Sequence, residues 1–210
     1  MPQNTCEDRN INTFKGFQDM TRILFVCHGN ICRSPMAEFV MKDLVKKAGL
    51  ESQFHIESAA TSTEEIGNPV YPPARRKLAE HGIGCAGKTA RQLKNEDYER
   101  YDLLIGMDRA NLRNMHRICG GDFKGKMHLL MEFAGRRRKG TPRESGGAGC
   151  VGRGEARGRL QFSPRAETDG SGLCAGEVAD PWYTGDFEAT WRDVLDGCEG
   201  LLRAVREECL

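Results

Sequence analysis

The chain has 210 residues, of which 39% are hydrophobic and 29% are charged, and its formal net charge at pH 7 is +1. This balance excludes a nucleic-acid binder built on a basic face, and no apolar run reaches the roughly 18 residues that a membrane span requires. The nine cysteines are irregularly spaced, and the N-terminus lacks the basic start and apolar stretch of a secretory signal, so we expect reduced thiols in a cytoplasmic protein.

Strand and helix patterns alternate along the chain. Residues 22–26 (RILFV) form a continuous apolar run, which is typical of a strand buried on both faces of a parallel sheet. Apolar residues at helical spacing follow from Ser34 to about Gly49. Further strands are predicted at 54–58, 101–105 and, more weakly, 126–130, and further helices at 74–81, from about 108, and at about 187–206. This alternation predicts an α/β domain with right-handed crossovers.

Two segments do not fit this domain. Residues 136–177 contain ten of the 25 glycines, with nine Lys and Arg against five Asp and Glu, and few large apolar side chains. Such a composition buries too little apolar surface to offset the entropy of ordering the chain, so it predicts a flexible insertion. For the same reason residues 1–21 are predicted to form a flexible N-terminal arm, with one domain over residues 22–210.

The most informative stretch is residues 26–35, VCHGNICRSP. A buried strand ends there, a glycine-containing loop follows, and a helix is predicted to begin with Ser34 as N-cap and Pro35 at its first position. Inward-facing amides of such a loop and the helix dipole bind a phosphate and favour the thiolate form of Cys27. The planar guanidinium of Arg33 can hold two phosphate oxygens. Together these residues predict nucleophilic attack on phosphorus.

The spacing Cys-x5-Arg occurs a second time, from Cys85 to Arg91. By chance alone, about one match is expected in a chain of this composition. The second occurrence has no apolar strand before it and no Ser or Thr after the arginine, so we interpret it as accidental.

A general acid is needed to protonate the leaving group of a phosphate ester. The candidate is Asp180, which precedes Pro181, Trp182 and Tyr183. The adjacent aromatic residues could flank an aromatic substrate ring. An Asp-Pro pair most often only initiates a turn, so the spacing alone supports this assignment weakly.

These two motifs, CxGNICRSP near the N-terminus and DPxY near the C-terminus, resemble those of the low-molecular-weight protein tyrosine phosphatases. The resemblance covers the whole core, including residues 106–108 (GMD) and 89–92 (TARQ). It implies the flavodoxin-like phosphotyrosine protein phosphatase I fold, an α/β fold with a four-stranded parallel sheet flanked by helices and the phosphate loop at the strand-order switch point. It also implies a protein-tyrosine-phosphatase that needs no cofactor and acts on phosphotyrosine proteins or aryl phosphates.

The resemblance assigns the catalytic roles residue by residue. Cys27 is the implied nucleophile, Arg33 the phosphate clamp and Asp180 the acid and base. The implied phosphate-binding loop comprises His28, Gly29, Asn30, Ile31, Cys32 and Arg33.

Supporting roles follow from the same resemblance. Asn30 would hold the loop conformation, Ser34 would donate to the Cys27 thiolate, and Cys32 would trap oxidised Cys27 as a disulfide. A small buried residue without a redox role remains the alternative for Cys32. Asp108 would either support the loop or only cap its helix. Trp182 and Tyr183 would line the substrate pocket.

Two features depart from the family pattern. The predicted insertion lies directly before Asp180, where family members usually have a short connection. Glu64 and Glu65 stand where many eukaryotic members carry an aromatic residue, so acidic phosphopeptides should be repelled.

Two other functions remain open. An insertion that disables the acid loop would leave a phosphate-binding pseudophosphatase. An arsenate reductase would need further cysteines after the third strand, and residues 105–112 (IGMDRANL) contain none. The five histidines lack metal-ligand spacing, so no metal is expected: His28, His55, His81, His116 and His128.

Overall fold

The computed structural model describes residues 20–135 and 176–208. The predicted arm over 1–21 and the predicted insertion over 136–177 therefore lie almost entirely outside the described residues.

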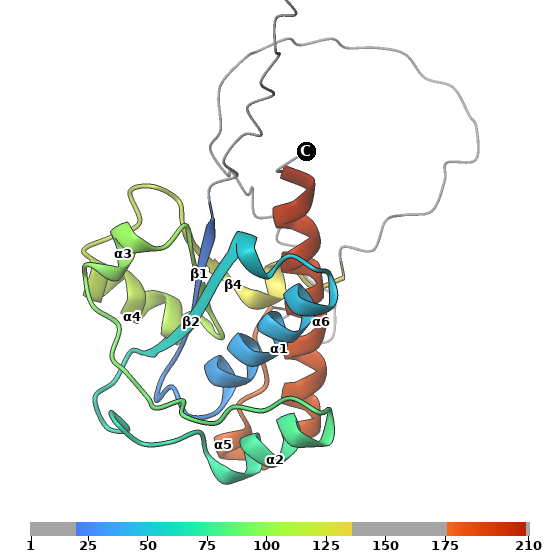
Figure 1. Cartoon of the computed structure of the whole chain (residues 1–210). Coiled ribbons are helices and arrows are strands. Elements are labelled where there is room, and N and C mark those ends of the chain that lie inside the picture. Colours follow the sequence, from blue (N-terminus) through green and yellow to red (C-terminus); the bar gives the residue numbers. More distant parts are fainter. Residues whose placement is uncertain (1–19, 136–175, 209–210) are drawn as a thin grey trace, which may run out of the picture.

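The centre of the molecule is a four-stranded parallel sheet with the order β2-β1-β3-β4 (Figure 1). Its strands are β1 (Thr21–Cys27), β2 (Phe54–Ala60), β3 (Leu103–Gly106) and β4 (Met127–Leu129). Cys27 pairs with Ala60, and Val26 with Gly106, so the carboxyl ends of three strands meet at one edge. The predicted four-stranded α/β fold is confirmed.

Helices cover both faces of this sheet (Figure 1). On one face, α1 (Arg33–Lys47) and α6 (Phe187–Glu208) pack against each other and bury Ile23 and Phe25 of β1. On the other, α4 (Arg109–Cys119) covers Leu24 and Val26. Because successive strand residues point to opposite faces, burial of both faces explains the continuous apolar run of β1.

The remaining elements are short. They are α2 (Pro72–Glu80), α3 (Asp97–Arg100), α5 (Pro181–Thr184) and the 3-10 turns η1 (Glu51–Gln53) and η2 (Leu130–Glu132). The periodicity predicted α2 but none of the others, because a single turn gives no helical repeat. The fourth strand was predicted over 126–130 and ends at Leu129, where the chain turns into η2.

The start of α1 differs from the prediction. The helix begins at Arg33 with Cys32 as N-cap, so Ser34 is its second residue rather than its cap. The Ser34 side chain is fully buried and lies 3.0 Å from the Cys27 sulfur. The Ser34 hydroxyl, which the local sequence would assign to capping the helix, therefore contacts Cys27 instead, as the resemblance implied.

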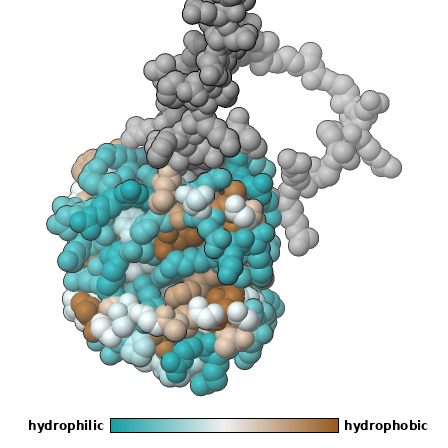
Figure 2. Space-filling view, in the orientation of Figure 1, coloured by the Kyte–Doolittle hydropathy of each residue, from teal (hydrophilic) through white to brown (hydrophobic). Residues whose placement is uncertain are grey.

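Figure 2 shows that hydrophilic residues cover most of the face on which β2 and α1 lie, with apolar residues in scattered patches. Among the described helices, none is both long and apolar enough to cross a membrane.

Candidate active site

A pocket of about 210 Å³ lies over the loop that joins β1 to α1, at the carboxyl edge of the sheet. Parallel α/β sheets bind ligands at this edge, where the strand order reverses. The pocket brings together residues from three segments of the chain: Cys27, His28, Gly29, Ile31, Cys32, Arg33, Glu64, Glu65, Asp180, Trp182 and Tyr183.

The sulfur of Cys27 lies at the end of β1 and is almost completely buried. The Asn30 N–H donates to it over 3.3 Å, and the Ser34 Oγ lies 3.0 Å from it. Ser34 Oγ accepts a hydrogen bond from the side-chain Nδ2 of Asn30 at 2.9 Å, so the hydroxyl proton of Ser34 is available to the sulfur. The Asn30 N–H and the Ser34 hydroxyl thus both lie within hydrogen-bond distance of this atom, and donors in these positions would stabilise an anionic sulfur.

Asn30 belongs to the loop, but its side chain is buried and does not line the pocket. It is the only described non-glycine residue with a positive φ, at 58°. Its Nδ2 also donates to Ser58 Oγ at 2.7 Å, and its Oδ1 accepts from the Arg91 N–H at 3.2 Å. Contacts from β2 and from residue 91 thus hold the left-handed turn that shapes the loop.

This network extends to a buried carboxylate that the sequence analysis missed. Ser58 donates to Glu38 at 2.5 Å, and the Nζ atoms of Lys88 and Lys42 lie 2.9 and 2.5 Å from Glu38 oxygens. The two lysines offset the charge of a side chain that is 4% exposed. Glu38 occupies one face of α1 among polar and apolar neighbours, so no spacing in the sequence indicated its role.

Arg33 contacts two carboxylates with its two terminal nitrogens. Nη1 donates to Asp108 Oδ2 at 2.7 Å, and Nη2 lies 2.5 Å from Asp180 Oδ2. Burial opposes the charge of the guanidinium, but the Cys27 sulfur, Asp180 and Asp108 outweigh burial and raise the pKa of Arg33 above its ordinary value. A fixed cation therefore lines the pocket.

Asp108 makes the contacts of both roles that the sequence left open, helix cap and support of the loop. Its Oδ1 caps α4 by accepting from the Asn111 N–H at 2.6 Å, while Oδ2 contacts Arg33. Capping fixes the carboxylate, and the carboxylate in turn orients the guanidinium.

Asp180 is the N-cap of α5, with Oδ1 accepting from the Trp182 N–H at 3.1 Å. The turn-initiating role of this Asp-Pro pair therefore coexists with a carboxylate that faces the pocket. Trp182 and Tyr183 are 59% and 86% exposed, so their rings stand at the pocket mouth. The Trp182 ring also lies 5.7 Å from that of Tyr71.

Cys32 lines the same pocket as Cys27. Burial, followed by the nearby negative charges of Cys27 and Asp180, raises the pKa of the Cys32 thiol to about 12. At neutral pH this group is therefore a thiol and a weak nucleophile.

The rim of the pocket is acidic. Glu64 and Glu65 both line it, and Glu64 Oε2 lies 3.2 Å from His28 Nε2. A Cβ added to Gly29 would come within 3.2 Å of the Glu65 Cγ, so the loop and the rim pack closely at this glycine. The two glutamates that depart from the family pattern therefore lie at the pocket itself.

The second Cys-x5-Arg stretch forms no comparable site. Cys85 is buried in the hydrophobic core, and burial raises the pKa of its thiol. The Arg91 guanidinium points elsewhere and pairs with Glu57 and Asp97. In the described part of the chain, no group of His, Cys, Asp and Glu could hold a metal ion.

Comparisons with known proteins agree with this geometry. A family model described as low molecular weight phosphotyrosine protein phosphatase matches residues 22–142. The low molecular weight protein-tyrosine-phosphatase YfkJ of Bacillus subtilis is 32% identical over 191 residues, which cover 90% of this chain and 98% of that protein. The low molecular weight phosphotyrosine protein phosphatase of Gallus gallus is 42% identical over 114 residues, which cover 53% of this chain and 72% of that protein.

Solved structures give the same result. The crystal structure of YfkJ superposes with a TM-score of 0.71 at 29% identity and covers 93% of this chain and all of that one. The low molecular weight protein tyrosine phosphatase SP-PTP of Streptococcus pyogenes superposes with a TM-score of 0.62 at 32% identity, covering 88% of this chain and 92% of that one. The similarity therefore extends over most of the chain and not over the loop motif alone.

Proposed function

Because the chain belongs to the low molecular weight phosphotyrosine protein phosphatases, we propose that it hydrolyses phosphotyrosine and aryl phosphates through a phosphocysteine intermediate on Cys27. The observation that supports this most directly is the meeting of Cys27, Arg33 and Asp180 in one pocket of about 210 Å³. A nucleophile, a phosphate-binding cation and a proton donor are the groups that the reaction requires.

In the first step the substrate phosphate occupies the loop and contacts Arg33. The Cys27 sulfur attacks phosphorus, the bond from phosphorus to the aryl oxygen breaks, and Asp180 gives its proton to the departing oxygen. The Asn30 N–H and the Ser34 hydroxyl hydrogen-bond to the sulfur before it attacks phosphorus, and again when it leaves phosphorus as a thiolate.

In the second step a water molecule attacks the phosphocysteine. The Asp180 carboxylate takes a proton from that water, the bond from sulfur to phosphorus breaks, and inorganic phosphate and the Cys27 thiolate are released. The acid of the first step is thus the base of the second, as the principle of microscopic reversibility requires.

The pocket mouth favours an aromatic ester. Trp182 and Tyr183 stand on one side with largely exposed rings, which can flank the ring of phosphotyrosine. A phosphotyrosine protein or a small aryl phosphate is therefore the proposed substrate. A reducing compartment such as the cytoplasm suits a catalytic thiol, and we place the activity there.

Replacing Cys27 by Ser tests the proposed chemistry. We expect at least about a thousandfold loss of kcat with p-nitrophenyl phosphate, because the hydroxyl is a far weaker nucleophile than the thiolate. Cys85→Ser is the matched control, since it makes the same change in the accidental motif and should retain the activity of the parent protein. Equal losses in the two variants would show that the wrong loop has been assigned.

The same assay decides between this function and the two alternatives. A pseudophosphatase would bind phosphate without releasing p-nitrophenol, and an arsenate reductase would turn over arsenate only with a thioredoxin system. The contact between Asp180 and Arg33 supports a role for this carboxylate as the acid, and therefore favours the hydrolase.

A further inference from the structure

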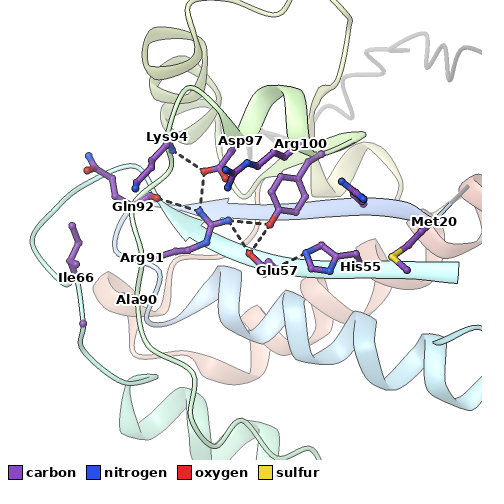
Figure 3. A pocket seen from close by; sticks show the side chains of 13 residues that line it. Met20, His55, Glu57, Ile66, Ala90, Arg91, Gln92, Lys94, Asp97 and Arg100 are labelled. Carbon is purple, nitrogen blue, oxygen red and sulfur yellow. Dashed lines mark hydrogen bonds and ion pairs between the residues drawn. The ribbon is translucent and has the colours of Figure 1, made fainter. Parts of the chain in front are cut away.

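A second cavity, of about 900 Å³, lies beside the phosphate pocket and is separate from it. We call it the edge cavity, since it lies at the β2 edge of the sheet, and its lining is drawn in Figure 3. One loop borders both spaces, because Glu64 and Glu65 line the phosphate pocket while Ile66 and Gly67 line the edge cavity. No residue of the edge cavity lines the phosphate pocket, although the Arg91 N–H contacts Asn30 of the phosphate loop.

Both carboxylates of the edge cavity, Glu57 and Asp97, are engaged by one guanidinium, that of Arg91. Arg91 Nη1 donates to Asp97 at 2.9 Å, and its Nη2 donates to Glu57 at 3.1 Å. The Tyr101 hydroxyl donates to the same Glu57 oxygen at 2.6 Å, and the Lys94 N–H donates to Asp97 at 2.9 Å. Figure 3 shows Arg91 in the middle of the cavity wall, between these acids.

Three further cations line the edge cavity without a carboxylate partner among the described residues, so that four cationic side chains face two carboxylates. The side chains of Arg22, Lys94 and Arg100 are exposed, and none of the described carboxylates lies within 4.0 Å of their charged nitrogens. With Glu57 and Asp97 engaged by Arg91, the open side of the cavity is cationic. Clusters of this kind bind phosphate groups, with Arg providing paired donors and Lys a point charge.

Apart from Gln92, the rest of the lining is apolar or aromatic. Met20 and Ile66 are 45% and 50% exposed and lie at opposite ends of the cavity in Figure 3. The exposed His55 ring lies between them on β2. A cavity of this size is in the range that holds a small organic ligand, whereas inorganic phosphate would fill only a small part of it.

We propose that the edge cavity is a second ligand site, which binds an organic phosphate of nucleotide size. Its phosphate groups would contact Arg22, Lys94 and Arg100, and its organic part would pack against Met20, His55 or Ile66.

The cavity wall is joined directly to the phosphate loop. The Arg91 N–H donates to Asn30 Oδ1 at 3.2 Å, so the residue at the centre of the cavity wall also holds the left-handed turn of the loop. The segment that carries Arg91 is bonded to the rim loop as well, from Ala90 N to Asn68 O and from Gly67 N to Ala90 O, at 2.8 and 2.9 Å. A ligand in the edge cavity therefore touches both elements that frame the active site.

We expect from this connection that an occupant of the edge cavity changes the phosphatase rate. This part of the inference rests on the proposed function. The coupling is reciprocal, so a ligand in the phosphate pocket should change the affinity of the edge cavity by the same factor.

Binding is tested by calorimetry on the full chain, with the phosphate pocket saturated by benzylphosphonate and adenosine 5′-diphosphate as the probe. We expect saturable binding, which the double variant Arg22→Glu with Arg100→Glu weakens at least about tenfold, because two charged donors are replaced by repelling carboxylates. The milder pair Arg22→Gln with Arg100→Gln should weaken it less, and guards against misfolding of the charge-reversed protein.

Arg113→Glu is the control, since it reverses one exposed charge on α4, outside the cavity, and should leave the affinity unchanged. Absence of saturable binding, or an equal loss in Arg113→Glu, would overturn the site. Inorganic phosphate should bind more weakly than adenosine 5′-diphosphate, and equal affinities would overturn the assignment of an organic ligand.

Coupling is tested by the rate with p-nitrophenyl phosphate at saturating adenosine 5′-diphosphate. We expect kcat/KM to change in the parent protein and to stay constant in the Arg22→Glu, Arg100→Glu variant. If adenosine 5′-diphosphate binds to the parent protein but kcat/KM stays unchanged, the coupling would be overturned. A protein that binds the probe but has no phosphatase activity would instead contradict the proposed function and leave the ligand site standing.

Discussion

Arg33 binds one carboxylate that is fixed and one that a substrate must displace. Asp108 is held from behind by its cap on α4, whereas Asp180 reaches the same guanidinium from within the pocket. In the proposed mechanism, a phosphate dianion would compete with Asp180 for Nη2 of Arg33. Substrate binding would then free the Asp180 side chain beside the ester oxygen that it is proposed to protonate.

Asp180→Asn tests this competition and the role of the acid together. We expect kcat/KM, which reports the first chemical step, to fall about a hundredfold or more with phenyl phosphate, whose leaving group needs a proton, and much less with p-nitrophenyl phosphate. Inhibition by inorganic phosphate should become stronger, because the amide leaves Nη2 of Arg33 without its competing charge. Equal slowing of both esters would be inconsistent with proton donation by Asp180.

At the scale of elements, the contact of α6 with η2 depends on two glycines. A Cβ added to Gly197 would lie 2.5 Å from the Leu130 Cγ, and one added to Gly200 would lie 1.9 Å from the Phe133 carbonyl oxygen. The sequence predicted α6 from its apolar spacing. It gave no sign that these glycines are sites of close approach, because the residues they touch are distant in the chain.

Gly200→Ala is therefore expected to destabilise the protein by about 1–3 kcal/mol, although alanine is the better helix former by about 1 kcal/mol. The carbonyl of Phe133 belongs to the backbone, so it cannot rotate away from the new methyl group. Urea unfolding followed by circular dichroism measures the change. Gly84→Ala is the control, because an added Cβ there meets no atom within 4 Å. A Gly200→Ala protein as stable as this control would refute the close packing of α6.

For the whole molecule, a formal charge of +1 conceals two local fields of opposite sign. Glu64 and Glu65 make the rim of the phosphate pocket acidic, whereas Arg22, Lys94 and Arg100 make the edge cavity cationic. Charges near a binding site select partners by attraction and repulsion even where they add little affinity.

The acidic rim predicts a preference for phosphotyrosine peptides with Lys or Arg beside the phosphotyrosine over peptides with Asp or Glu there. We expect the variant Glu64→Lys with Glu65→Lys to reverse the ratio of the two kcat/KM values, and high salt to reduce the preference in both proteins. Glu51→Lys with Glu96→Lys makes the same change of charge at exposed positions outside the pocket and should keep the original preference. If the ratio of the two kcat/KM values is unchanged in the Glu64→Lys, Glu65→Lys variant, the rim does not determine peptide specificity.

The amino-acid sequence by itself determined the alternating strands and helices, the loop from Cys27 to Arg33 and the family. These features depend on neighbours within a few residues, where apolar period, glycine and proline act directly. The longer elements were placed within a few residues, and the single-turn helices were missed because they are too short to repeat.

Only the tertiary structure decided how distant segments meet. It put Ser34 beside the Cys27 sulfur, as the resemblance implied, and not at the cap that the local sequence predicted. It brought Asp180 onto Arg33, and placed Ser58, Glu38 and the Arg91 N–H behind Asn30. It also left Arg22, Lys94 and Arg100 unpaired around one cavity while Arg91 engaged both acids. Hydrogen bonds and ion pairs act through space over a few ångströms, so residues far apart in the chain acquire partners only when the sheet and its loops are assembled.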